Sequence, residues 1–219
     1  MGTQIERYGC VVLGAGDILD YGRVASLAAH GAFVICADGG FVHCAALGLR
    51  PSLLVGDFVS LACSAPADIP RVALSPDKDY TDSFHAAEQA IERGHKRLLL
   101  AGMLGGRLDH TLANLQLLAR LAGVGAHCLL TDGATDAYAL AGAGELTLPM
   151  REGCYFSLLA LESCRDVSIS GGKYPLRGYH LRGDDPRAIS NEFAGRDVRI
   201  TQKAGLLIAV SCPIESGGL

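Results

Sequence analysis

Residues 102–114, with the sequence GMLGGRLDHTLAN, combine glycines with an arginine, an aspartate and a histidine. The apolar run Leu98–Ala101 before them predicts a buried strand, and the apolar spacing from Asp109 onward predicts a helix. A glycine turn from a strand into a helix presents backbone N–H groups and the positive end of the helix dipole, and Arg107 adds a planar set of donors suited to phosphate. The segment therefore predicts an anion pocket in which Asp109 and His110 face the group that carries the anion. The alternative is a tight turn with Arg107 and Asp109 paired on the surface.

Six aspartates follow predicted strands in a chain that is only mildly acidic overall: Asp38, Asp57, Asp77, Asp79, Asp82 and Asp109. Gathered in one place they would repel one another unless a hard cation or a cationic ligand lay among them. Mg²⁺ takes one or two carboxylates and completes its shell with water and substrate phosphates. The segment DKDYTD suits this chemistry, because Lys78 adds positive charge near a polyphosphate. Thr81 has an alternative role as the cap of a helix that begins at Asp82.

The elements that must position these residues alternate strand and helix over about the first 135 residues. The predicted strands are 8–13, 32–37, 53–55, 98–101 and 128–131, and the predicted helices are 18–29, 41–47, 82–93 and 109–122. Continuous apolar strands separated by helices are typical of a doubly wound parallel sheet covered on both faces. Ligands bind such sheets outside the carboxyl ends of the strands. Each polar, glycine-marked segment follows a strand, so we expect the distant carboxylates to converge at one edge.

The pattern changes after about residue 135, where turns rich in Gly, Pro and Asp separate short apolar runs. The predicted strands there are 145–148, 155–161, 167–170, 198–201 and 206–210. This pattern favours a small all-β sandwich after the α/β domain. We predict an α/β nucleotide-binding catalytic domain over 1–135 and a β-sandwich domain over 136–219, with the boundary within the Gly- and Ala-rich segment 132–144.

The composition excludes several classes of protein. The formal charge is −4 and no Lys- or Arg-rich run occurs, which argues against a nucleic-acid surface. No apolar run reaches the roughly 18 residues of a membrane span, and the N-terminus lacks the pattern of a signal peptide, so we expect a cytoplasmic protein that does not span a membrane. The eight cysteines form no C-x-x-C pair and several lie in apolar runs, which predicts reduced core residues.

The motifs resemble those of the thiamine pyrophosphokinases, in the same order along nearly the whole chain. The family pattern A-D-G-G, G-D-x-D-S, D-K-D-x-T-D, G-G-R-x-D-H-x-x-x-N, G-L-K-Y-P-L and S-N-E is similar to residues 37–40, 56–60, 77–82, 105–114, 171–176 and 190–192. The resemblance implies an α/β domain followed by a β-sandwich. It also implies transfer of a pyrophosphoryl group from ATP to the hydroxyl of thiamine, which leaves AMP, in a homodimer with its active sites between the subunits.

The resemblance also implies roles for individual residues. The implied Mg²⁺ ligands are Asp57 and Asp82, with Asp79 as a further candidate. The implied ATP-binding residues are Asp38, Gly39, Gly40, Asp57, Lys78, Asp79, Thr81, Gly105, Gly106 and Arg107. The implied thiamine-binding residues are Asp109, His110, Asn114, Ser190 and Asn191, the last two from the partner subunit. Catalysis would rest on Asp57, Asp82, Arg107 and Asp109, because phosphoryl transfer needs charge neutralisation and an oriented hydroxyl.

Two departures from the family pattern keep other functions open. Val59 replaces the second aspartate of G-D-x-D-S, and Gly172 replaces the leucine of G-L-K-Y-P-L, which we expect to loosen one wall of the sandwich. Val59 motivates an alternative, a catalytically weakened sensor that binds thiamine, its diphosphate or a nucleotide. The acidic cluster alone would also fit a metal-dependent transferase that uses a nucleotide-sugar, but the R-x-D-H loop and the sandwich disfavour it.

Overall fold

The computed structural model describes residues 7–57, 68–75 and 79–214. Val59, Asp77 and Lys78 lie outside the described residues. The described residues form two compact units: one contains those up to 117 together with Ala126–Gly133, and the other contains Leu118–Gly125 and residues 134–214. The predicted boundary at residue 135 stays a prediction.

The first unit is built on six strands whose neighbours all pair in parallel. They are β1 (Tyr8–Leu13), β2 (Ala28–Ala37), β3 (Leu53–Gly56), β4 (Arg71–Ala73), β5 (Arg97–Ala101) and β6 (His127–Thr131). Their order is β6-β5-β1-β2-β3-β4. The apolar runs are buried: Val11, Val55 and Leu99 have no exposed surface. The parallel α/β sheet predicted from these runs is confirmed.

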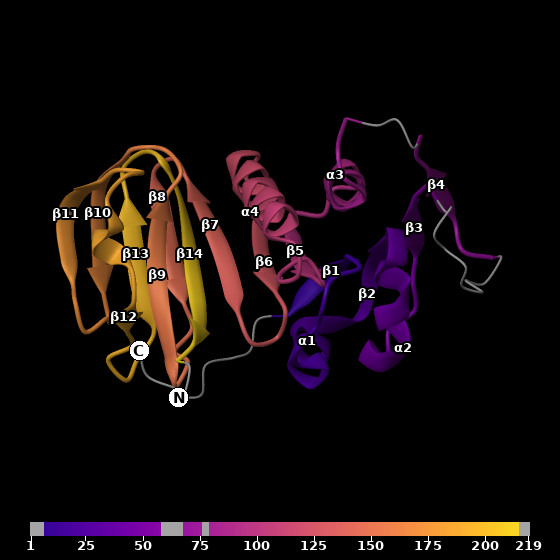
Figure 1. The fold of residues 1–219 in the computed structure, drawn as a ribbon, viewed down its shortest axis with the longest axis horizontal. Coiled ribbons are helices and arrows are strands. Elements are labelled where there is room, and N and C mark those ends of the chain that lie inside the picture. The colour runs from indigo at the N-terminus through magenta and orange to yellow at the C-terminus, as the bar shows by residue number, and fades with distance from the viewer. Residues whose placement is uncertain (1–6, 58–67, 76–78, 215–219) are drawn as a thin grey trace. The chain divides into compact units, whose positions relative to one another are not determined.

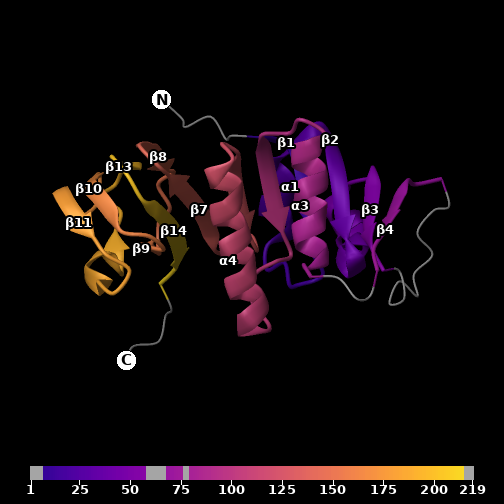
Figure 2. The same ribbon diagram turned by 90° about the horizontal axis from the view of Figure 1, so that it is seen from above.

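The helices cover both faces of this sheet. The helices α1 (Tyr21–Leu27) and α2 (His43–Leu47) lie on one face and α3 (Asp82–Glu92) on the other (Figure 1, Figure 2). The chain moves outward from β1 to β4 and then returns through α3 to β5 on the opposite side of β1. The loops after β1 and β5 therefore leave the sheet in different directions, which places a ligand crevice at the carboxyl ends of these two strands.

Two predicted helices differ from the structure in their bounds. The helix expected over 18–29 is only α1, because Asp20 caps it through a 2.8 Å bond from the Arg23 amide and the chain from Ala28 joins β2. The helix expected over 41–47 is a 3₁₀ turn, η1 (Asp38–Val42), followed by α2. In contrast, α4 (Leu108–Gly123) and α3 lie within one residue of their predicted bounds.

The second unit is a sandwich of two antiparallel sheets, as the sequence predicts. One sheet has the order β12-β9-β14-β7 and the other β11-β10-β13-β8. The strands are β7 (Asp136–Ala141), β8 (Gly144–Leu148), β9 (Cys154–Ala160), β10 (Cys164–Ser170), β11 (Leu176–Leu181), β12 (Asn191–Glu192), β13 (Val198–Gln202) and β14 (Leu206–Pro213), with a 3₁₀ turn, η2 (Pro186–Ala188). Phe156, Val198 and Leu207 are buried between the sheets. The strand β7 lies within the segment expected to be a linker, because its alternating alanines give a weak apolar signal.

Seven cysteines lie in the described part of the chain. All seven are free, and six of them are buried, while Cys212 is half-buried. The prediction of core cysteines is confirmed for the six buried residues, their reduced state stays a prediction, and Cys63 lies outside the described part. No helix among the described residues is long and apolar enough to cross a membrane.

Candidate functional site

The loops that follow β1 and β5 meet through their backbones. The amide of Gly14 donates to the Ala101 carbonyl at 2.8 Å, and that of Gly16 donates to the Gly102 carbonyl at 2.7 Å. A Cβ on Gly14 would lie 2.5 Å from the Gly102 oxygen, so only glycine allows this approach. The sequence reasoning did not single out the segment Gly14–Gly16. The sequence does contain a signal for it: Gly14 and Gly16, separated by one residue, come directly after a strand that ends at the ligand-binding edge.

The Asp38–Gly40 segment, at the end of β2, packs equally closely. A Cβ on Gly40 would lie 2.1 Å from the Leu13 carbonyl oxygen, and one on Gly56 would lie 3.3 Å from the Asp38 Cα. Asp38 has a φ of 46°, which costs free energy for a residue other than glycine but is tolerated best by Asp and Asn. The backbone therefore holds the Asp38 carboxylate at the sheet edge in a conformation imposed by its neighbours.

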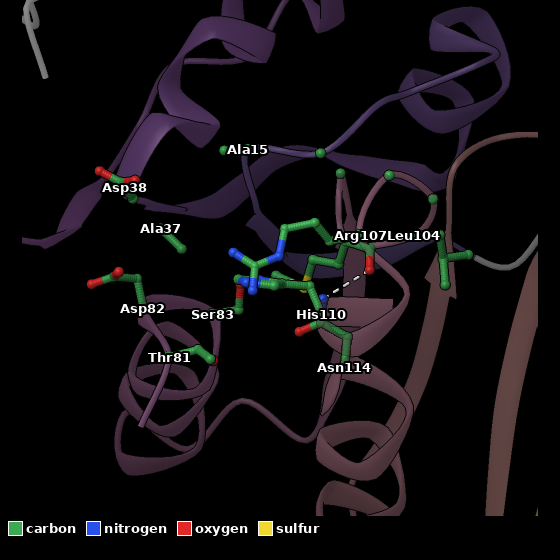
Figure 3. A pocket seen from close by; sticks show the side chains of 15 residues that line it. Ala15, Ala37, Asp38, Thr81, Asp82, Ser83, Leu104, Arg107, His110 and Asn114 are labelled. Carbon is green, nitrogen blue, oxygen red and sulfur yellow. Dashed lines mark hydrogen bonds between the residues drawn. The ribbon is translucent and has the colours of Figure 1, made fainter. Parts of the chain in front are cut away.

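A pocket of about 280 Å³ lies at this edge and is lined only by residues of the first unit. Figure 3 shows Asp38, Thr81 and Asp82 on one side of it and Arg107, His110 and Asn114 on the other. Gly105 and Gly106 also line it, so eight of the predicted site residues share one pocket. The pocket is also lined by seven residues to which the sequence reasoning gave no individual role: Ala15, Gly16, Ala37, Ser83, Gly102, Met103 and Leu104.

Two helices begin at the pocket. Thr81 caps α3, because its Oγ1 accepts a 3.2 Å bond from the Phe84 amide, and Asp82 lies in the first turn. The helix α4 begins after Gly105 and Gly106, whose φ values of 77° and 62° favour glycine. Thr81 therefore does have the capping role that the sequence left open. Two helix N-termini at one pocket provide N–H groups and positive partial charge for an anion.

Arg107 and Asp109 form a two-point ion pair, which the sequence raised as an alternative. The Arg107 Nε donates to Asp109 Oδ1 at 3.1 Å and Nη2 to Oδ2 at 2.6 Å. This hydrogen bonding holds the pKa of the Asp109 carboxyl below its ordinary value and raises the pKa of the guanidinium. Both side chains are exposed, so this pairing leaves Arg107 able to turn toward an anion in the pocket. Asp109 itself does not line the pocket.

Asn114 supports the glycine loop from α4. It is buried, and its Nδ2 donates to the Met103 carbonyl at 2.8 Å. The hydroxyl of Thr111 donates to the Gly105 carbonyl at 3.1 Å. These two bonds fix the loop between β5 and α4, so Asn114 serves the shape of the pocket through its backbone contact.

Gly39 and Asp57, two further predicted residues, lie at the same edge of the sheet as Asp38. Gly39 packs against Ala15: a Cβ on Gly39 would lie 3.1 Å from the Cβ of Ala15. Asp57 directly follows β3, whose Val55 is in register with Ala37 of β2, so Asp57 lies at the same edge as Asp38. Asp57 and Asp79 do not line the pocket, and Lys78 lies outside the described part of the chain. Their roles stay predictions.

Two carboxylates line the pocket, those of Asp38 and Asp82. Among residues 7–57, 68–75 and 79–214, no three His, Cys, Asp or Glu side chains form a group that would hold a metal by themselves. Mg²⁺ needs no such group, since it commonly takes one or two carboxylates and the oxygens of a bound phosphate. The donor set therefore fits Mg²⁺ that arrives with a phosphate ligand.

Ser190 and Asn191 belong to the sandwich, where Asn191 has a structural role. Its buried amide accepts bonds from the Tyr174 and Glu192 amides at 3.0 and 2.9 Å and donates to the Tyr174 carbonyl at 2.7 Å. Ser190 has a φ of 56°, and its amide donates to Ser157 Oγ at 3.0 Å. The asparagine thus holds the Tyr174 backbone, and the serine is exposed beside it.

Gly172 fits closely in the sandwich and does not loosen it. A Cβ at this position would lie 2.7 Å from Cζ of Phe156 and 3.1 Å from Nδ2 of Asn191. Phe156 is fully buried and packs against Phe193 with 5.1 Å between ring centroids. The phenylalanine ring fills the space beside Gly172, so the expectation of a loosened wall is wrong.

Comparisons with known proteins agree with this architecture. The model of the thiamin pyrophosphokinase catalytic domain matches residues 24–130, and that of the thiamin pyrophosphokinase vitamin B1 binding domain matches residues 145–207. Thiamine pyrophosphokinase of Bacillus subtilis is 28% identical over 183 residues, which cover 80% of this chain and 85% of that protein.

Solved structures show the same fold. The structure of the Bacillus subtilis enzyme matches with a TM-score of 0.83 at 24% identity, over 94% of this chain and 99% of that one. Thiamin pyrophosphokinase from Geobacillus thermodenitrificans matches with a TM-score of 0.82 at 25% identity, over 94% and 98%. The matched domains lie in both units of the fold and include the pocket residues from Ala37 to Asn114, and the chain belongs to the thiamin pyrophosphokinase family.

Proposed function

We propose that this protein transfers a pyrophosphoryl group from ATP to the hydroxyl of thiamine, forming thiamine diphosphate and AMP. The observation that carries the proposal is the pocket at the carboxyl edge of the parallel sheet, where two helix N-termini, Arg107 and the Asp38 and Asp82 carboxylates meet. This combination suits a metal-bound polyphosphate better than a neutral or cationic ligand alone. Membership of the family supports the same reaction.

The proposed metal is Mg²⁺, held by Asp82 and Asp38 in the pocket, with Asp57 and Asp79 as further ligands at the same edge. Bound Mg²⁺ supplies neutralisation of phosphate charge and a fixed orientation of the phosphate oxygens. The carboxylates of the pocket have a second use, because they favour the cationic thiazolium ring of thiamine.

The residues of the chain supply positioning and charge. The N–H groups at the start of α4 and the loop glycines Gly105 and Gly106 bind the phosphates. Arg107 leaves Asp109 and turns to the phosphates, which stabilises the charge that develops during transfer. Asp109, released from that ion pair, accepts a hydrogen bond from the thiamine hydroxyl and orients its oxygen for attack. His110 and Asn114 complete the wall on this side.

The proposed assembly is a homodimer with active sites at the subunit interface. Ser190 and Asn191 of the partner subunit would then contact thiamine, as the family resemblance implies. The exposure of Ser190 is compatible with this role, whereas the amide of Asn191 is already bonded to Tyr174. Asn191 would therefore act by holding the Tyr174 backbone.

The deciding experiment incubates the purified protein with thiamine, ATP and Mg²⁺ and measures AMP and thiamine diphosphate together. Equal amounts of the two products are expected, and the reaction should stop when EDTA is added. ADP in place of AMP would contradict pyrophosphoryl transfer. UDP-sugar binding without ATP binding would support the nucleotide-sugar alternative.

The second candidate is a sensor that binds thiamine, its diphosphate or a nucleotide without turnover, and Val59 favours it. A sensor would be stabilised by the ligand, so the melting temperature would rise while no AMP formed. Val59→Asp separates the two functions further. In a weakened enzyme this substitution should lower the Mg²⁺ concentration for half-maximal activity, and in a sensor it should not produce AMP.

A further inference from the structure

We infer that Tyr21 and His43 form a positioning pair that fixes the distance between two walls of the pocket. The hydroxyl of Tyr21 lies 2.8 Å from Nδ1 of His43, and the ring centroids are 5.8 Å apart. The inference rests on the proposed function in one respect only, the identity of the ligand as a nucleotide polyphosphate. Neither residue lines the pocket, so both act through the segments that they join.

The positions of the two residues in the chain explain what their contact controls. Tyr21 is the first residue of α1, which follows the segment Gly14–Gly16. His43 is the first residue of α2, which follows the Asp38–Val42 turn. Ala15, Gly16, Ala37 and Asp38 line the pocket. The Tyr21–His43 bond therefore joins the start of α1, which follows β1, to the start of α2, which follows β2.

The environment of His43 favours the neutral form of its ring. The residue is only 6% exposed, and this burial lowers its pKa below the ordinary 6.5, an effect that the Gly16 backbone and Asp17 partly oppose. The ring is therefore neutral near pH 7, and a neutral ring that carries its hydrogen on Nε2 accepts the hydroxyl proton of Tyr21 at Nδ1.

The ring of His43 also interacts with the backbone of the pocket loop. Nε2 is buried and makes no hydrogen bond within the described part of the chain. The Gly16 backbone nevertheless raises the pKa of the ring, which is the effect of a nearby carbonyl acceptor. A buried donor without a full hydrogen bond costs free energy, so His43 is present at this position despite that cost. Its contact with both Tyr21 and Gly16 accounts for the retained polar ring.

The fit of the two walls leaves little room for adjustment. The segments that follow β1 and β2 already lie in close contact, since Gly39 packs against Ala15 and Gly40 packs against the Leu13 carbonyl. A shift of α1 against α2 is therefore transmitted to the Gly16 and Asp38 backbones, because packed segments of this kind move together. The two walls of the pocket at Gly16 and Asp38 would then lose their spacing.

The test compares Tyr21→Phe, His43→Leu and His43→Asn. The first two remove the hydrogen bond, whereas the asparagine keeps an acceptor near the position of Nδ1. Isothermal titration with a non-hydrolysable ATP analogue and Mg²⁺ should show affinity about threefold to tenfold weaker for Tyr21→Phe and His43→Leu, and near the original value for His43→Asn. The double variant should be no weaker than His43→Leu, because both changes remove one interaction. The KM for thiamine should stay unchanged.

Tyr179→Phe is the matched control, since it removes a 2.6 Å hydrogen bond from a tyrosine hydroxyl to Asp185 in the sandwich. It should leave nucleotide affinity as it is. Unchanged affinity in Tyr21→Phe, or equal losses in His43→Asn and His43→Leu, would overturn the inference and leave a packing role only.

Amide hydrogen exchange of the ligand-free protein separates this inference from the proposed function. Tyr21→Phe should speed exchange at Gly16 and Gly40 relative to Tyr179→Phe, whether or not the protein binds ATP. Unchanged exchange at both amides would contradict the positioning pair. A protein that binds no nucleotide but shows faster exchange would contradict the proposed function and support the pair.

Discussion

The α/β unit and the sandwich use their predicted site residues in different ways. In the α/β unit, Asp82 and Arg107 extend from the starts of helices into a pocket. In the sandwich, Asn191 is 4% exposed, and its side-chain amide makes three hydrogen bonds with backbone groups of Tyr174 and Glu192. Each of the two regions matches a domain of the family. The comparison shows that one motif residue can line a pocket while another holds the backbone beside it.

The largest effect is expected where a side chain acts on the ligand. Asp82→Asn removes the charge from the pocket and keeps the shape of the side chain. We expect kcat to fall by about 100-fold or more, because the charged carboxylate is the proposed metal ligand. The free energy of unfolding should fall by only about 0.3–1 kcal/mol, from the lost interaction with the helix dipole. Steady-state kinetics and thermal melting measure the two quantities.

Glu92→Gln on the same helix provides the control for this change. It neutralises one carboxylate at the far end of α3, where Glu92 accepts a 2.7 Å bond from Gln89. Its kcat should stay within twofold of the unsubstituted protein. Turnover that survives in Asp82→Asn would remove this residue from the proposed metal site and weaken the contrast between the two units.

The second effect should appear in stability. Asn191→Ala removes the buried amide that bonds to the partly buried backbone of Tyr174, which should cost about 1–3 kcal/mol of unfolding free energy. Gln202→Ala is a matched control in the same unit. Gln202 is also 4% exposed and donates to three carbonyl oxygens, those of Leu140, Gly142 and Gly205.

Urea denaturation and the KM for thiamine together sharpen the comparison. Both variants should lose similar stability, but only Asn191→Ala should raise the KM for thiamine, because it releases the loop beside Ser190. Equal KM values in the two variants would show that this part of the sandwich does not contribute to thiamine binding.

The sequence predicted the sheet well and the pocket only in part. The bounds of β1 were predicted correctly because Tyr8–Leu13 is a continuous apolar run that ends at a glycine. The strand β7 was missed because every second residue in it is an alanine. The alanine side chain is too small to give a clear alternation of apolar and polar residues. Gly14–Gly16 was missed for a different reason. Two glycines after a strand indicate a turn, and only the pairing of β1 with β5 brings them against Gly102.

The carboxylates show the same limit. Asp38 and Asp82 were predicted to converge from the rule for parallel sheets, and both line the pocket. The rule gives the edge of the sheet and not the direction of each side chain. For this reason it could not separate Asp82 from Asp109, whose carboxylate bonds to Arg107 instead.

A third effect tests the departure at Gly172 in the sandwich. Gly172→Ala adds a methyl group 2.7 Å from Phe156 Cζ, so the ring must move, and we expect a cost of about 1–3 kcal/mol. Phe156→Leu creates space there but loses buried area. The double variant should therefore be more stable than the sum of the single changes predicts, by about 1 kcal/mol or more. Additive changes in urea denaturation would mean that the two residues are not coupled.

The smallest effect is a dependence of stability on pH that arises in the α/β unit. Burial lowers the pKa of His43 below 6.5, so between the lowered value and 6.5 the unfolded chain binds more protons than the folded one. The contribution is present in full above pH 6.5 and is lost as pH falls through the folded pKa. We expect the melting temperature between pH 7 and pH 5 to fall about 1–3 °C less in His43→Asn than in the unsubstituted protein. An identical fall in both proteins would mean that His43 titrates alike in the folded and unfolded chain, and that the polar ring beneath the pocket is not held neutral by burial.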